Sequence, residues 1–121
     1  MPKTILLVSR DEVLQNTRAH VLEAVGYRTT KASNLTSAAQ LTSHCHMSII
    51  GHSFSPEEQD EFIDVVHEGN PSVFMLCLRF GLTHPRALLA VVDKCFAAQP
   101  GGSRVYIVEE SNVIPWPGKA S

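Results

Sequence analysis

The sequence lacks the features that would mark it for export, for a membrane or for nucleic acid. Its first apolar run, Ile5 to Val8, is too short for a signal peptide or a membrane span. The net charge is −2, with 10 basic and 12 acidic residues, so no basic excess points to DNA or RNA. We therefore expect a cytoplasmic protein that binds neither nucleic acid nor a membrane.

Cysteine motifs and phosphate loops are also missing. Cys45, Cys77 and Cys95 are odd in number and have no CxxC spacing, which favours reduced thiols. No glycine-rich loop follows the first apolar run, which argues against nucleotide or flavin binding. We expect no cofactor.

A histidine-rich stretch is the only candidate metal site. His44 and His46 flank Cys45, and His52 follows a few residues later. His46 and His52 bracket a predicted strand, so they should lie at opposite ends of a sheet. We therefore expect polar surface residues here and no metal site.

The composition favours one globular domain. The chain has 121 residues, of which 44% are hydrophobic, enough for a core of its own. We place this domain at residues 1–111. Residues 112–121 contain two prolines and a glycine and are predicted to be a flexible C-terminal tail.

Short apolar runs alternate with amphipathic stretches of helical length, which is typical of an α/β protein with a parallel sheet and right-handed crossovers. In the first predicted helix, one apolar face would comprise Val13, Leu14, Val21, Leu22 and Val25. The segment Ser55-Pro56-Glu57-Glu58 is a strong helix start with a capping box. The predicted strands are Ile5–Val8, Tyr27–Lys31, Met47–Gly51, Val73–Leu78 and Val105–Val108, and the predicted helices are Asp11–Val25, Leu35–Ser43, one from Ser55 to about Gly69, and Pro85–Ala97.

In such sheets, ligands bind at the carboxyl ends of the strands. The segments expected there are Ser9-Arg10-Asp11, Gly51-His52-Ser53 and Cys77-Leu78-Arg79.

Over roughly residues 3 to 98 the sequence resembles the receiver domains of two-component response regulators. The blocks that carry the resemblance are KTILLVSRDEVLQNTRAHVLEAVGY, MSIIGHSFSPEEQDEFIDVV and PSVFMLCLRF. The resemblance implies a flavodoxin-like three-layer sandwich with five parallel strands in the order 2-1-3-4-5. It also implies a role in signal transduction.

The resemblance assigns family positions that this chain fills with other residue types. The acidic pair that holds Mg²⁺ corresponds to Ser9 and Arg10, the phosphoacceptor aspartate to His52, and the switch hydroxyl to Cys77. The lysine after the last strand has no clear counterpart. Asp11, next to the acidic pair, falls on a position that is usually a helix cap. We therefore expect no catalytic residue and no bound Mg²⁺.

Two structural alternatives remain for the C-terminal part. Either the fifth helix of the family is missing, which keeps an unbroken β-α order, or Pro85–Ala97 is that fifth helix and the fourth has been deleted. For Arg10, a salt bridge with a carboxylate of another loop competes with anion binding in the vacant pocket. His52 is expected to be a polar loop residue near Ser9 or Ser53.

The sequence thus favours a stand-alone pseudo-receiver, not an enzyme, that acts through protein–protein contact. The expected partners are a histidine kinase, another regulator, or a second copy in a homodimer. Two alternatives stay open: a flavodoxin-like small-ligand or anion binder or enzyme, and an active receiver that uses Asp11 in a shifted register.

Overall fold

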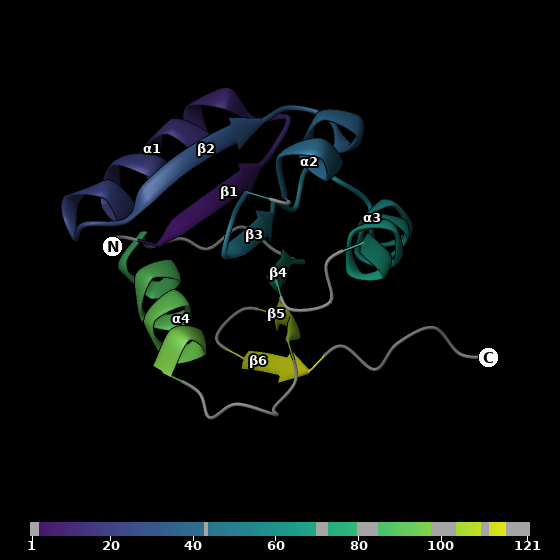
Figure 1. Cartoon of the computed structure of the whole chain (residues 1–121). Helices are drawn as coiled ribbons and strands as arrows, with labels where there is room; N and C mark the ends of the chain where they lie inside the picture. Colours follow the sequence, from purple (N-terminus) through teal and green to yellow (C-terminus); the bar gives the residue numbers. More distant parts are fainter. Residues whose placement is uncertain are drawn as a thin grey trace.

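The chain forms one sheet with helices on both faces in the computed structural model (Figure 1). The structure describes residues 3–42, 44–69, 73–79, 85–97, 104–109 and 112–115. No helix within these ranges is long and apolar enough to cross a membrane. The strands are β1 Thr4–Val8, β2 Arg28–Ala32, β3 Met47–Ile50, β4 Phe74–Leu78, β5 Val105–Glu109 and β6 Asn112–Pro115, and the helices are α1 Glu12–Ala24, α2 Leu35–Thr42, α3 Pro56–Gly69 and α4 Pro85–Ala97.

The predicted sheet order is confirmed. The strands lie in the order β2-β1-β3-β4-β5-β6, and the first five are parallel. Val8 is paired with Ile50, Ile50 with Cys77 and Cys77 with Ile107. This register brings the carboxyl ends of β1, β3 and β4 to the same edge.

The sheet has a sixth strand that the sequence did not predict. Residues Asn112–Pro115, predicted as the start of a flexible tail, pair antiparallel with β5 through Ile107↔Ile114 and Glu109↔Asn112. Only residues 110 and 111 separate the two strands, which makes them a hairpin. Pro115 ends the strand, where its missing N–H interrupts no interior ladder. The remainder of the predicted tail, 116–121, lies outside the described residues.

The core is divided by the sheet into two layers. Leu6 and Val8 of β1 face a cluster that includes Ala38 of α2 and Phe62 of α3. The alternate residues, such as Leu7, face a second cluster built from α1 and α4. Figure 1 shows α2 and α3 on one side of the sheet and α1 and α4 on the other, which confirms the three-layer sandwich.

The position of α4 contradicts the expected handedness. α1 links β1 to β2 in one direction across the sheet, whereas α4 links β4 to β5 in the other direction on the same face. The β4-α4-β5 crossover therefore has the opposite hand to the crossover through α1, against the usual rule. Leu88 and Val92 of α4 bury Leu76 and Leu78, which α1 does not cover alone.

This placement bears on the two alternatives for Pro85–Ala97. In chain order the helix is the fourth, as the unbroken β-α pattern predicts, and no helix follows β5 in the described residues. In space it lies beside α1, on the face left for a helix after the last strand. The helix therefore has the chain position of a fourth helix and the packing position expected of a fifth.

The buried face of α1 also differs from the prediction. Val13 and Val25 were expected in the core, but they are 78% and 54% exposed. Two polar residues, Gln15 and Arg18, lie on the buried face instead of the valines, and Gln15 donates hydrogen bonds to the sheet edge below it. The buried residues of α1 are Gln15, Arg18, Ala19 and Leu22.

Candidate functional site

The loops after β1 and β3 meet at the carboxyl edge, as predicted. Ser9 is buried, and its Oγ lies 3.5 Å from Ser53 Oγ. The N–H of Asp11 donates to Ser9 Oγ at 3.0 Å, and the N–H of Arg10 donates to Ser53 Oγ at 3.0 Å. The two hydroxyls therefore join the loops through the main chain.

Arg10 closes this edge by binding α3. Its guanidinium donates to both carboxylate oxygens of Glu58, at 3.2 and 2.7 Å, and to the Ser53 carbonyl at 3.2 Å. Its Cζ atom lies 4.4 Å from the centre of the Phe54 ring. The structure therefore confirms the first interpretation of Arg10, a salt bridge with a carboxylate of another segment.

Glu58 is held in turn by the predicted capping box. Its carboxylate accepts from the Ser55 N–H at 3.0 Å, and its own N–H donates to Ser55 Oγ at 3.2 Å. The hydrogen bonds from Arg10 and from the Ser55 main chain lower the pKa of Glu58 to about 2. The same pair raises the pKa of Arg10.

Asp11 is the N-cap of α1. Its carboxylate accepts from the Leu14 N–H at 3.0 Å, and the residue is exposed. The β1 register is regular through Val8, and the Ser9 N–H continues it by donating to the Ala32 carbonyl at 3.1 Å. Asp11 therefore holds the cap position that the family pattern assigns to it.

His52 and Cys77 lie apart from this network. His52 is exposed and has no hydrogen bond within the described residues, so the expected contact with Ser9 or Ser53 is absent. Cys77 is fully buried in the α2–α3 core. Burial raises the pKa of the Cys77 thiol to about 12, so the sulfur is protonated and lies beneath the edge.

Arg18 is a residue of this edge that the sequence interpretation missed. Its side chain comes from α1, is only 4% exposed, and its Nη2 has no hydrogen-bond partner within the described residues. A Cβ atom at Gly51 would lie 3.3 Å from Arg18 Nη1 and 3.3 Å from Ser9 Oγ. The guanidinium therefore adjoins the Ser9 and Gly51 loops, and desolvation lowers its pKa.

Two buried glutamines complete the edge, and neither was predicted. Gln15 Nε2 donates to the carbonyls of Leu7 and Ala32, at 2.7 and 3.0 Å. Gln59 Nε2 in α3 donates likewise to the carbonyls that end β3 and β4, those of Gly51 and Leu78, at 3.1 and 3.0 Å. One sequence signal could have identified Gln15 and Arg18. They are three residues apart, and each lies four residues before an apolar residue, Ala19 or Leu22, so all four share one face of the helix.

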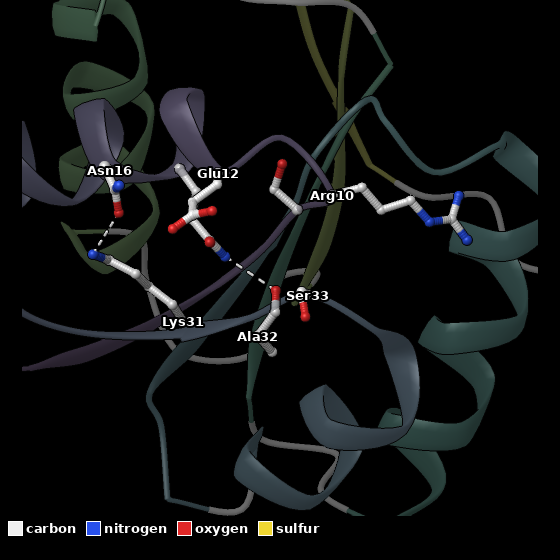
Figure 2. Close-up of a pocket in the computed structure, with 8 residues that line it drawn as sticks. Arg10, Glu12, Asn16, Lys31, Ala32 and Ser33 are labelled. Carbon is white, nitrogen blue, oxygen red and sulfur yellow. Dashed lines mark hydrogen bonds between the residues drawn. The ribbon is translucent and has the colours of Figure 1, made fainter.

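A polar cavity of about 450 Å³ lies beside the edge, between α1 and the end of β2. In Figure 2, Glu12 and Asn16 point toward Lys31 across it, and the Arg10 side chain extends away from it. The Lys31 ammonium donates to Asn16 at 2.7 Å. The lining residues are Ser9, Arg10, Glu12, Gln15, Asn16, Lys31, Ala32 and Ser33.

The donors at this edge do not suit a divalent ion. Mg²⁺ prefers carboxylate oxygens, whereas the positions that the family resemblance assigns to this site hold a hydroxyl at Ser9, a guanidinium at Arg10 and an imidazole at His52. Elsewhere in the described ranges no three His, Cys, Asp or Glu side chains are grouped to hold a metal. His46, which borders the histidine-rich stretch, accepts the Thr4 N–H through Nδ1 at 3.0 Å.

Solved structures define the class of fold: it is that of response-regulator receiver domains. A receiver domain protein from Methanospirillum hungatei matches with a TM-score of 0.68 and 16% identity, over 78% of this chain and 93% of that one. The chemotaxis protein CheY4 of Vibrio cholerae has a TM-score of 0.68 and 14% identity, over 78% and 98%. A response regulator from Burkholderia pseudomallei, described with a phosphorylated aspartic acid, has a TM-score of 0.60 and 22% identity, over 91% and 61%.

At sequence level, no family model and no curated protein matches the chain.

Proposed function

We propose that this chain is a receiver-like signalling module of two-component type that acts through protein–protein contact and not through phosphoryl transfer. The fold supports the signalling class, because its structural neighbours are receiver domains. The carboxyl edge, which lacks carboxylates at the positions expected to bind Mg²⁺, supports action by protein–protein contact without phosphoryl transfer. A histidine kinase, another regulator, or a second copy of the chain would be the partner.

The observation that carries the proposal is the Arg10–Glu58 pair. In a phosphorylated receiver, Mg²⁺ offsets the charge of the incoming phosphoryl group and an aspartate attacks phosphorus. Here a guanidinium stands in the loop of the metal ligands and is bonded to α3 at 2.7 Å. Arg18 adds a second cation at the edge, where a dication would be repelled.

The direct test is beryllofluoride with Mg²⁺, which imitates a phosphorylated aspartate. We expect no change in the amide resonances of residues 9–11 and 51–53 of the full chain. A small phosphodonor should likewise add no mass. An aspartyl phosphate that disappears in Asp11→Ala would contradict the proposal and favour the shifted-register receiver.

A positive control follows from the same alignment. The triple variant Ser9→Asp, Arg10→Asp and His52→Asp restores a carboxylate at each metal and phosphoacceptor position. Binding of Mg²⁺ by this variant and not by the wild-type chain would locate the lost function in these side chains. Sedimentation of the wild-type chain at increasing concentration tests the homodimer.

A second candidate, a small-ligand binder, is favoured by the polar cavity beside β2. Cavities at the carboxyl ends of parallel strands are common ligand sites. Native mass spectrometry of the purified chain tests it: a co-purified small molecule that is lost in Lys31→Ala would favour this candidate over the adaptor.

A further inference from the structure

The opposite edge of the sheet, where the parallel strands begin, holds a second cluster of cations that the proposed function does not use. Lys3 precedes β1, His46 precedes β3 and Arg104 precedes β5, and the parallel order brings these positions to one edge. They line a cavity of about 220 Å³ together with Cys45, Val73, Phe74 and Phe96.

Two aromatic rings hold the cations in place. Lys3 Nζ lies 4.9 Å from the centre of the Phe96 ring, and Arg104 Cζ lies 4.5 Å from the centre of the Phe74 ring. The rings meet edge to face, with centroids 5.6 Å apart and an angle of 83°. Because cation–π contacts already order both side chains, a ligand would cost them little further entropy.

Among the described residues, no carboxylate offsets the charge of these cations. Neither Lys3 nor Arg104 forms an ion pair with another described residue, and none of the described lining residues is acidic. Asp93, in the same helix as Phe96, accepts a hydrogen bond from Tyr27 instead. The cavity is therefore positive.

At the carboxyl edge, by contrast, Arg10 and Arg79 are each paired with a carboxylate of α3. Two arginines of the carboxyl edge are thus ion-paired, whereas Lys3 and Arg104 at the amino edge form no ion pair with a described residue.

His46 adds a hydrogen-bond donor. Because its Nδ1 accepts the Thr4 N–H, the neutral ring carries its proton on Nε2. A lysine, an arginine and an imidazole N–H are a donor set suited to phosphate oxygens.

We propose that this amino-edge cavity binds a phosphate group. The cavity is smaller than the roughly 300–1,000 Å³ of sites that enclose drug-sized ligands, which restricts the ligand to free phosphate or a small phosphate ester. The site is independent of the carboxyl edge and goes beyond the proposed signalling function.

The test is a titration of the full chain with inorganic phosphate and, separately, with glycerol phosphate, at constant ionic strength. Amide resonances of residues 3–4, 45–46 and 104–105 should shift in a saturable way. Tighter binding of glycerol phosphate would identify an ester as the ligand, and equal binding would identify the ion itself. Lys3→Gln and Arg104→Gln should each weaken binding about tenfold, the loss of one charge-assisted hydrogen bond.

Arg86→Gln is the matched control, because Arg86 is an exposed arginine in the first turn of α4 and does not line this cavity. It should leave phosphate binding unchanged, and Lys3→Arg should bind phosphate almost as well as the wild-type chain. Absence of saturable shifts at millimolar phosphate would overturn the proposal. So would equal weakening by Arg86→Gln, or shifts confined to the loops around Ser9. Circular dichroism shows whether each variant keeps the fold.

Discussion

Glu58 has two partners, the guanidinium of Arg10 and the main chain of Ser55, and both favour its ionised form. Its pKa is about 2 in the folded chain, against about 4.3 for an unfolded glutamate. A carboxyl group with a lower pKa in the fold stabilises it above the unfolded pKa. That contribution is lost as the pH falls through the folded pKa.

We therefore expect the gap in unfolding temperature between the wild-type chain and Glu58→Gln to be constant near neutral pH. It should shrink from about pH 4 towards pH 2. Thermal unfolding followed by circular dichroism measures it. Glu57→Gln, on the next residue of the same helix, is the control, and a Glu58 gap that persisted at pH 2 would show that the pair does not form in solution.

Arg18 presents the opposite case, a cation without a hydrogen-bonded partner in the described residues. A desolvated charge of this kind costs stability, and replacing it with an apolar side chain of similar length removes that cost. We expect Arg18→Met to raise the free energy of unfolding by about 1–2 kcal/mol in urea denaturation.

Arg28→Met is the matched control, because Arg28 is an exposed arginine at the start of β2. Its effect should stay within about 0.5 kcal/mol. If Arg18→Met instead destabilised the chain by more than 1 kcal/mol, the guanidinium would have a partner in solution, as removal of a satisfied buried donor costs about that much.

At the scale of elements, α1 and α3 perform the same task on different strand pairs. Gln15 crosslinks the ends of β1 and β2, and Gln59 crosslinks the ends of β3 and β4. Each amide group satisfies two main-chain carbonyls where the ladder ends. The helices are thereby joined to the sheet by polar contacts as well as by the core.

Substitution of Gln15 with methionine keeps the shape and the helix propensity but removes both hydrogen bonds. We expect Gln15→Met to lower the free energy of unfolding by about 1–3 kcal/mol, since the two buried hydrogen bonds from its amide to the Leu7 and Ala32 carbonyls are lost. His20→Met, at an exposed position of the same helix, should change it by no more than about 0.5 kcal/mol. Equal effects of the two substitutions in urea denaturation would contradict this role for Gln15.

For the whole molecule, the pattern of apolar runs was sufficient to predict the five parallel strands, and the family resemblance supplied their order. Ile5–Val8 and Val73–Leu78 are continuous apolar stretches because strands covered on both faces need them. The helix starts at Asp11 and Ser55 were also readable, since a capping side chain acts on its own helix. Local chemistry of this kind does not depend on how distant parts of the chain pack.

The features that were wrong or missed depend on distant contacts. The pairing of β6 with β5 was missed because the two residues between them in the sequence, Glu110-Ser111, do not include the glycine or asparagine that marks a two-residue hairpin. The side on which α4 packs is set by the apolar surface that α1 leaves open. The ion-pair partner of Arg10 and the burial of Arg18 both depend on how α1 and α3 pack on the sheet. Arg10 and Glu58, for example, are more than 40 residues apart in the sequence.

The Arg10–Glu58 bond also has a consequence for how information would pass through the proposed module. A receiver that is phosphorylated alternates between two surfaces under the control of a kinase, whereas this edge is joined by an ion pair between Arg10 and Glu58 that needs no phosphodonor. The fraction of the module bound to its partner would then depend only on the concentrations of the two proteins, by mass action. Gene expression and protein turnover, rather than a phosphate that comes and goes within seconds, would set the strength and the duration of the signal.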